Sequence, residues 1–410
     1  MATEAARTTG FRCHTIGMQL PMRPARGDGV RVIYFDHNAT SPLHSAARQA
    51  WVEAADNFPG NPSSPHRLGS RAEAALGAAR DRLAGFLNCR ADDLVWTSGA
   101  TEAFNTIVRH YAATLPSDAG VWLSAIEHPC VLAPARHAFG PRLRLLPVDR
   151  GGAVDPDWLG DALQRTRPGF IAVMAANNET GVLQPWRELR DLCRAHGVPF
   201  VCDATQWLGR LPAQALGEGE FVAASAHKLG GPRGVGFLQC PSAGRLTPLL
   251  RGGQQEEGRR AGTENVPGVM AMLAAIETRE WQLIANEHET REPWRDRFEN
   301  RLLERLSGSA IVGAGSPRLW NTVSALMPDT GCQSRWVVKL DKLGFAVSTG
   351  SACASGQEEA SHVISALGYS PAEAARVLRF SAGWETTEAD WDALLTALIQ
   401  AHAELSENPA

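Results

Sequence analysis

The chain has 410 residues, a formal net charge of −4 and a pI near 6.3. This length is too great for one small core and predicts about two or three packed units. The charge balance gives no electrostatic case for binding nucleic acid or an anionic membrane surface. No apolar run approaches the roughly 18 residues that a bilayer-spanning helix needs. We therefore expect a soluble protein with no nucleic-acid partner and no membrane segment.

The eight cysteines are scattered, with no Cys-x-x-Cys pair and no zinc-like spacing of cysteine and histidine. We expect them to be reduced and mostly structural, we expect no metal site, and cytoplasmic residence is the default. Residues 1–30 differ, because their arginines outnumber their acidic residues and no periodic apolar pattern is evident. An organellar transit peptide has this bias. A disordered extension, or a start codon placed too early with Met18 or Met22 as alternatives, is the favoured interpretation.

Beyond that tail the chain alternates helical and strand patterns, which is typical of an α/β domain with a largely parallel sheet. Short continuous apolar runs predict strands that are buried on both faces. The predicted helices cover residues 67–87, 100–112, 130–139, 155–165 and 186–196. The predicted strands cover residues 94–97, 121–125, 143–147, 170–175, 199–202 and 221–224.

The pattern changes after Gly262 and Thr263. One long helical segment is predicted from about residue 266 to 306, and short strands at 322–327, 346–348 and 377–381 then alternate with helices. We interpret residues 58–263 as a large domain, 264–410 as a smaller C-terminal α/β domain, and 31–57 as a segment that packs with the small domain. No internal repeat or low-complexity tract is visible.

The most informative stretch is Ser225-Ala226-His227-Lys228, which follows an apolar strand and precedes a glycine-rich turn. Asp203 lies at the end of the preceding strand. A lysine that forms a Schiff base and an aspartate that holds a pyridinium nitrogen are the two groups that pyridoxal phosphate (PLP) chemistry requires. Each residue alone could be a surface lysine or a capping aspartate. The pair, with its neighbours, favours a PLP site.

Polar residues follow three other predicted strands. Ser-Gly-Ala-Thr-Glu at 98–102 could bind phosphate at a helix N-terminus, or simply cap the helix. His128 is placed to enter the crevice where open α/β sheets bind ligands; it could stack on a flat cofactor and relay protons, or be satisfied by loop backbone. An amide in Asn177-Asn178-Glu179-Thr180-Gly181 could bond a cofactor oxygen or a substrate carboxylate, or the stretch could be a polar turn.

Two residues near the C-terminus carry further chemistry. Cys353 lies among glycine, serine and alanine at 348–356, so it is expected on an accessible loop that suits a sulfur nucleophile. A small residue in a tight turn is the alternative. Arg379 lies inside an apolar run, where a substrate carboxylate or a structural ion pair could be its partner.

Taken together and in this order, these residues resemble the cysteine desulfurases of the nitrogen-fixation and iron–sulfur-cluster type, within the class V aminotransferases of PLP fold type I. The resemblance runs from about Tyr34 to His402, and the stretch that follows Cys353 has the length of the group with a long cysteine loop. The motifs that carry the resemblance lie at residues 36–40, 60–64, 98–102, 127–128, 177–179, 203–206, 225–228, 260–263 and 350–353.

The resemblance implies a PLP site in the large domain. Lys228 would hold PLP as a Schiff base and then act as base at the substrate α-carbon. Asp203 would keep the pyridine nitrogen protonated, Gln206 would bond the phenolic oxygen, and His128 would stack on the ring and shuttle a proton. The residues implied to hold the phosphate are Ala100, Thr101, Ser225, His227 and, from the other subunit, Thr263.

The resemblance also implies the reaction. Arg379, helped by Asn178, would bind the carboxylate of L-cysteine, and the Cys353 thiolate would attack its sulfur to give a persulfide and alanine. A homodimer with a shared active site and a sulfur-acceptor protein are the implied partners. The acceptor would serve iron–sulfur cluster assembly, tRNA thiolation or another sulfur pathway.

Several positions depart from the family pattern. Gln254 replaces a usual glycine and restricts the backbone, while Glu257 reverses a usual arginine charge. Trp207 stands where a small residue is usual, and residues 357–360 differ from the common run after the cysteine. None of these departures removes a chemical group that the mechanism needs. They leave the substrate, the partner and the rate of reaction undetermined. The alternatives are a selenocysteine lyase, another C–S lyase or aminotransferase, or a non-catalytic scaffold that kept the fold.

Overall fold

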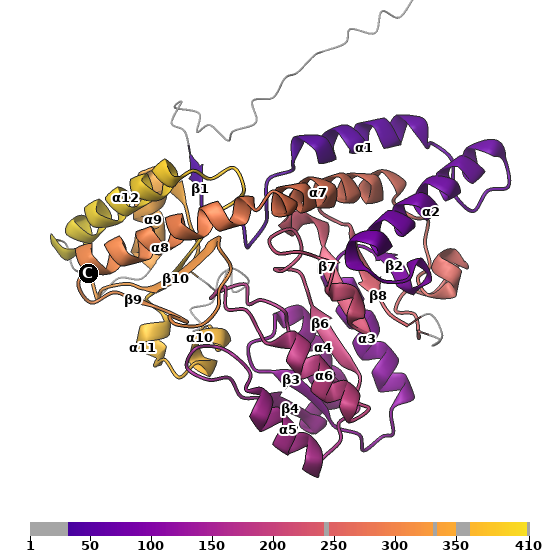
Figure 1. Ribbon diagram of the computed structural model, residues 1–410, viewed down its shortest axis with the longest axis horizontal. Helices are drawn as coiled ribbons and strands as arrows, with labels where there is room; N and C mark the ends of the chain where they lie inside the picture. Colours follow the sequence, from indigo (N-terminus) through magenta and orange to yellow (C-terminus); the bar gives the residue numbers. More distant parts are fainter. Residues whose placement is uncertain (1–31, 242–245, 331–333, 350–360, 408–410) are drawn as a thin grey trace, which may run out of the picture.

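The computed structural model describes residues 32–241, 246–330, 334–349 and 361–407. Within these residues the chain forms a large unit on a seven-stranded sheet and a smaller unit on a three-stranded sheet (Figure 1). The predicted α/β class is confirmed, with a mostly parallel central sheet flanked by helices and a smaller C-terminal α/β part.

The large sheet has the strand order β2-β8-β7-β6-β5-β3-β4. All six predicted strands are present, and the pairs from β7 to β4 are parallel. The strand that the sequence analysis missed, β8, is antiparallel to both of its neighbours. The strands are β2 (Leu94–Thr97), β3 (Val121–Ser124), β4 (Leu143–Leu146), β5 (Ile171–Ala172), β6 (Phe200–Asp203), β7 (Phe221–Ser225) and β8 (Gly236–Gln239).

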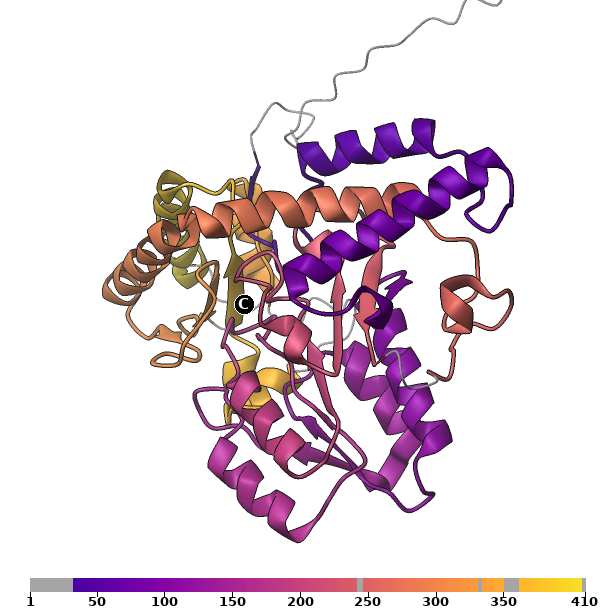
Figure 2. The same cartoon turned by 45° about the vertical axis from the view of Figure 1, so that its right-hand side comes forward.

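Helices cover both faces of this sheet, as Figure 2 shows. Side chains along β2 alternate between the faces, because Leu94 and Trp96 join one apolar core and Val95 joins the other. The helices on the Val95 side are α3 (Ala100–Thr114) and α4 (Pro129–Phe139). Those on the other side are α2 (Arg67–Leu87), α5 (Pro156–Arg165), α6 (Trp186–Ala195) and α7 (Val266–Ile284).

The smaller unit is built on an antiparallel sheet of order β12-β10-β9. Its core is separate from the two cores of the large sheet. A short parallel pair, β1 with β11, links the N-terminal segment to it. Its strands are β1 (Ile33–Tyr34), β9 (Ala310–Ile311), β10 (Thr322–Leu326), β11 (Phe345–Ala346) and β12 (Val377–Ser381), and its main helices are α8 (Glu287–Arg305), α9 (Ser334–Lys342) and α12 (Glu388–Glu407).

The single helix predicted for residues 266–306 is wrong. The structure has two helices there, α7 and α8, separated by Ala285 and Asn286. Asn286 has φ +56°, in the left-handed region that asparagine tolerates better than most residues. Neither glycine nor proline lies at the break, so the two strongest helix-ending signals are absent from the sequence there.

Core packing suggests a domain boundary later than Thr263. Residues of α7 join the apolar core of the large sheet, whereas Phe298 and Leu302 of α8 join the core of the small sheet. Helix α1 (Ser45–Asn57) also packs along α7, and the two lie side by side in Figures 1 and 2. We therefore propose that the boundary lies near Asn286, with α1 assigned to the large unit.

None of the helices within the described ranges is both long enough and apolar enough to cross a bilayer.

One buried ion pair holds the segment before α7 against the large unit. Both Glu256 carboxylate oxygens accept from the Arg80 guanidinium, at 2.8 and 3.0 Å, and one also accepts from the Trp96 backbone N–H at 3.0 Å. The Glu256 side chain is only 2% exposed. Its neighbour Glu257 has a similar left-handed backbone but a side chain that is 75% exposed.

Replacing Glu256 with alanine is expected to cost about 3–5 kcal/mol in the free energy of unfolding, because it leaves the Arg80 charge without its carboxylate. Urea denaturation measures the change. Glu257→Ala is the matched control, since it alters a neighbouring residue of similar φ and should change stability by less than about 1 kcal/mol. Equal losses in the two variants would assign the effect to the backbone rather than to the ion pair.

Candidate active site

The site is a cavity of about 260 Å³ at the carboxyl ends of β3, β5, β6 and β7. Nine of the twelve residues predicted for the site line it. Five lining residues were not predicted, and they complete the wall. The lining residues are Ala39, Ala100, Thr101, His128, Cys130, Met174, Ala176, Asn178, Asp203, Thr205, Gln206, Ser225, His227 and Lys228.

Lys228 ends a short 3-10 turn that follows β7. Its ammonium group donates to the backbone carbonyls of Asn38 at 2.7 Å and Ala39 at 2.9 Å. The Ser41 hydroxyl donates to the Lys228 carbonyl at 2.9 Å. The N-terminal segment therefore lies directly against the lysine, a contact that the motif at 36–40 did not reveal by itself.

Asp203 is the last residue of β6 and is almost fully buried. Burial raises the pKa of its carboxyl group, while the hydrogen bond from the Thr205 N–H and the Lys228 charge act against the rise. Gln206 donates from Nε2 to the Asn38 carbonyl at 3.0 Å. Among the described residues, Gln206 Oε1 and the Thr205 hydroxyl have no hydrogen-bond partner although both are buried. Polar atoms of this kind suit a polar ligand in the cavity.

His128 caps α4, and its Nδ1 accepts from the Cys130 N–H at 3.1 Å. A ring nitrogen that accepts carries no proton, so the neutral ring holds its proton on Nε2. Burial, followed by the charges of Lys228 and His362, lowers the pKa of His128 to about 4. The ring is therefore neutral at pH 7, with its donor at Nε2.

The turn at 98–102 lies against Ser225 and the start of α3. Ser225 Oγ accepts from the Ala100 N–H at 2.8 Å, which leaves the serine proton for another acceptor. Gly99 has φ +146°, and a Cβ there would lie 3.1 Å from Ser225 Oγ. The N-terminus of the 15-residue helix α3 favours an anion by its dipole and free N–H groups. His227 faces Thr40, at 3.1 Å between its Nδ1 and the hydroxyl.

Asn178 and Arg379 come together from the two units. The Asn178 carbonyl accepts from the Arg379 guanidinium at 3.0 Å and from the Asn38 amide at 3.1 Å. Arg379 is buried and also forms an ion pair with Asp36 at 2.6 Å. Of the two partners considered for Arg379 from the sequence, the structural ion pair is present. The side chain does not line the cavity but lies behind Asn178.

Two other predicted residues remain, Cys353 and Thr263. Cys353 lies outside the described residues. Thr263 is exposed on this chain, so its predicted contact with the phosphate of a partner subunit stays a prediction.

Three departures from the family pattern, at Gln254, Trp207 and Glu257, fit the structure locally, while residues 357–360 lie outside the described residues. Gln254 has φ −89°, so the backbone at this position does not need glycine. Trp207 points away from the cavity into the core, where its ring meets Trp186 edge to face and its Nε1 donates to the Pro212 carbonyl at 2.9 Å. Glu257 is exposed and lies 3.6 Å from Arg259.

Comparison with known proteins agrees with this geometry. The family described as Aminotransferase class-V matches residues 33–394. A cysteine desulfurase from Klebsiella pneumoniae is 37% identical over 375 residues, which cover 90% of this chain and 92% of the relative. The chain belongs to the class V aminotransferase family. Cysteine desulfurases are among the relatives that this sequence matches over about 90% of its length.

Solved structures show the same fold. The NifS-like protein from Rickettsia africae ESF-5 superposes with a TM-score of 0.80 and 28% identity, over 91% of this chain and 100% of that protein. A structure of SspA in complex with cysteine superposes with a TM-score of 0.73 and 26% identity, over 85% of this chain and 98% of that protein.

Class V aminotransferases use PLP, and the residues around this cavity fit it. A lysine amine and a buried carboxylate lie in one wall, and the N-terminus of α3 with Ser225 offers donors for a phosphate. The unsatisfied Gln206 and Thr205 oxygens add polar atoms to the same wall. Lys228, Asp203, Gln206, Ser225 and His227 are thus the residues that would hold the cofactor.

A buried histidine beside the site gives a prediction for pH dependence. Burial, with Arg210 and Arg279, lowers the pKa of His37 from 6.5 to about 4, although Glu385 acts in the opposite direction. Between these two values the unfolded chain takes up a proton that the folded chain does not. The free energy of unfolding should therefore fall as pH drops from 7, by about 2 kcal/mol at pH 5 from His37 alone.

Urea denaturation of the wild type and of His37→Gln at pH 7 and pH 5 measures this contribution. The variant should lose less stability between the two pH values. His137→Gln changes an exposed histidine and is the control. An unchanged pH dependence in His37→Gln would show that His37 is not the group responsible.

Proposed function

We propose that this protein removes sulfur from L-cysteine with PLP as cofactor, releasing L-alanine and holding the sulfur as a persulfide on Cys353. The observation that carries the proposal is the arrangement of Lys228 and the buried Asp203 in one cavity. The cysteine desulfurase relatives and the cysteine-bound SspA structure support the substrate. When bound, PLP supplies an electron-accepting ring that weakens bonds at the substrate α-carbon.

The large unit supplies the residues that hold the cofactor. The Asp203 carboxylate keeps a proton at the pyridine nitrogen, which offsets the cost of burying this carboxylate. Gln206 would bond the phenolic oxygen, and His128 would face the ring as a neutral imidazole. Ala100, Thr101, Ser225 and His227 bind the phosphate.

Lys228 moves the proton at the substrate α-carbon. Two backbone carbonyls, of Asn38 and Ala39, accept from its ammonium group in this structure. These two hydrogen bonds give the free lysine amine a defined position in the cavity wall. His128 can donate a second proton from Nε2, while its Nδ1 stays bound to the Cys130 N–H.

Arg379 and Asn178 orient the substrate carboxylate. The guanidinium already bonds Asp36 and the Asn178 carbonyl, which fix its direction. Guanidinium groups bind carboxylates in a bidentate geometry. The substrate carboxylate would share Arg379 with Asp36, and this sharing limits how tightly cysteine is held in its ground state.

Cys353 then takes the sulfur. Its thiolate attacks the substrate sulfur, the new S–S bond forms as the Cβ–S bond breaks, and the carbon keeps the electron pair and is protonated. Cysteine and one enzyme thiol thus become alanine and one enzyme persulfide. No external oxidant or reductant is needed.

The proposal includes partners and a location. A homodimer would place Thr263 at the phosphate of the partner subunit, and a sulfur-acceptor protein would take the persulfide sulfur. We place the protein in the cytoplasm, where free thiols such as those of Cys89 and Cys130 stay reduced.

The test is an absorption spectrum of the purified protein before and after addition of L-cysteine, with alanine and sulfide assayed in parallel. A spectral change with equal amounts of alanine and sulfide is the expected result. Pyruvate and ammonia in place of alanine would indicate a different C–S lyase, and a colourless protein that does not take up PLP would refute the proposal.

Cys353→Ala should keep the spectral change on addition of cysteine but lose sulfide release in the presence of a thiol, because only the acceptor of the sulfur is removed. A loss of about two orders of magnitude or more in turnover is expected. Cys89→Ala, which changes a cysteine that does not line the cavity, is the control. Full turnover by Cys353→Ala would exclude it as the sulfur acceptor.

Arg379→Lys should lower kcat/KM for L-cysteine by about ten- to a hundredfold, because the lysine keeps the charge but loses the bidentate geometry. Steady-state kinetics with L-cysteine measure the effect. Arg376→Lys, just before the same strand, should leave kcat/KM nearly unchanged. A loss of the same size in both variants would argue against a specific role in carboxylate binding.

A further inference from the structure

We propose that Glu179, Ser361 and His362 form a support that fixes the downstream end of the Cys353 segment to the large sheet, and that this support acts in persulfide formation rather than in cysteine binding. The inference rests on the proposed function. It assigns a positioning role to three residues that hold no cofactor or substrate atom themselves.

The upstream end of the segment is joined to the residue that orients the substrate carboxylate. Ser348 pairs with Arg379 through two backbone hydrogen bonds, of 2.8 and 3.2 Å. Arg379 is therefore paired with the chain at Ser348, five residues before Cys353. This pairing lies wholly within the small unit.

The downstream end is joined to the large unit instead. The Ser361 hydroxyl donates to the Glu179 carboxylate at 2.6 Å, and both side chains are buried. Ser361 also caps the short helix α10 (His362–Ala366) by accepting from the Ile364 N–H. Glu179 follows Asn178 directly, so this bond ties the segment to the loop that shapes the substrate site.

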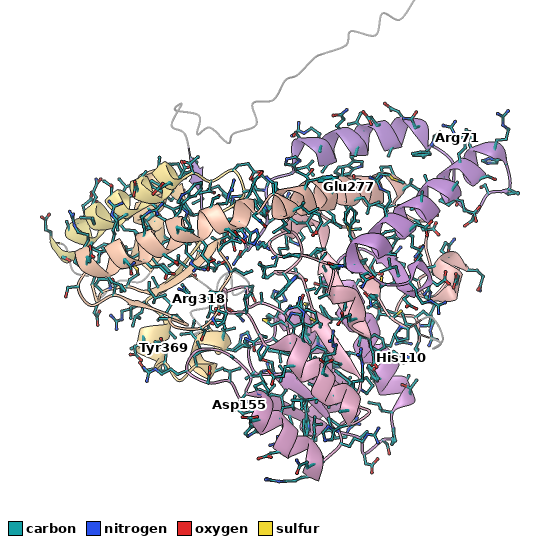
Figure 3. All side chains as sticks on the ribbon, viewed as in Figure 1. Arg71, His110, Asp155, Glu277, Arg318 and Tyr369 are labelled. Carbon is teal, nitrogen blue, oxygen red and sulfur yellow. The ribbon has the colours of Figure 1, made fainter. Side chains whose placement is uncertain are left out.

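His362 makes a second link to the large unit. Its Nε2 donates to the Glu127 carbonyl at 2.9 Å, and Glu127 directly precedes the cofactor-stacking His128. The next residues, Val363 and Ile364, pack in a cluster that contains Ile126 and Met174 of the large unit and Val377 of the small unit. Figure 1 shows α10 between the two sheets, and Tyr369, labelled in Figure 3, marks the chain shortly after it.

The electrostatics of Glu179 fit this role. Burial raises the pKa of Glu179, whereas the Ser361 hydroxyl and the charges of Arg379 and His362 lower it. The Ser361 hydroxyl is the hydrogen-bond partner of this side chain, and the Arg379 charge acts on it electrostatically.

Sulfur removal depends on this position. Attack requires the Cys353 sulfur to approach the substrate sulfur along the Cβ–S bond, so that the S–S bond forms while the carbon retains the electron pair. Reactions of this kind lose rate steeply when the reacting atoms are displaced by about 1 Å. Cysteine binding uses Arg379, Asn178 and the cofactor wall, none of which needs the downstream support.

Single-turnover mixing of the PLP-loaded protein with L-cysteine separates the two steps. The cofactor spectrum follows substrate binding, and mass spectrometry after alkylation follows the persulfide on Cys353. Glu179→Ala removes the acceptor but leaves the cap of α10 intact. It should slow persulfide formation by about tenfold or more while changing the binding step by less than about twofold. Glu179→Gln, which can still accept, should restore most of the rate.

Ser361→Ala tests the same bond from the other side. Its loss should match that of Glu179→Ala, and the double variant should be no slower than either single variant, because all three lack one shared interaction. Ser365→Ala, exposed on the same helix, is the control. Additive losses, an equal slowing of cysteine binding, or an unchanged rate of persulfide formation would each overturn the inference.

Amide hydrogen exchange in the PLP-free protein gives a readout that does not depend on activity. Glu179→Ala should speed exchange in residues 361–367, while Ser365→Ala should not. Unchanged protection in Glu179→Ala would show that Glu179 does not support the segment. If the wild type forms no persulfide, the proposed function fails, and the exchange experiment still decides whether the support exists.

Discussion

The buried side chain of Asn38 is the constraint on which the site depends. Its amide nitrogen donates to the Asn178 carbonyl at 3.1 Å and to the Thr322 hydroxyl at 2.9 Å. Its oxygen accepts from Arg210 and Asn321. Each hydrogen-bonding position of this amide is thus used, and the partners come from both units. A buried amide that is fully satisfied in one arrangement specifies that arrangement strongly.

The same residue also positions the catalytic groups. Its backbone carbonyl accepts from both Lys228 and Gln206, so the N-terminal segment fixes two residues of the cofactor wall. The segment then continues to Ser41, which bonds the Lys228 carbonyl. A displacement of this segment would move the lysine, the glutamine and the small unit together. The packing of the two units and the geometry of the active site therefore depend on the same residues.

The site contains buried carboxyl groups and buried histidines, and burial shifts the pKa values of the two in opposite directions. Burial raises the pKa of the Asp203 and Glu127 carboxyl groups, and it lowers the pKa of His128 and His227 to about 4. At neutral pH the histidines are uncharged and serve as donors or stacking surfaces. A charged Asp203 needs a cationic partner in the cavity. Glu127 is the carboxyl group more easily kept neutral. One of its oxygens accepts from the Met174 N–H.

The sequence by itself determined the alternation of strands and helices in the large unit, the polar residues at the strand ends, and the pairing of Lys228 with Asp203. These features are local, because apolar periodicity and strand-end position can be read over a few residues. Only the tertiary structure decided the break at Asn286, the antiparallel β8, the Asp36–Arg379 ion pair and the Glu179–Ser361 bond. The last two interactions join residues far apart in the chain. No local sequence pattern predicts which distant residue will pair with a buried charge.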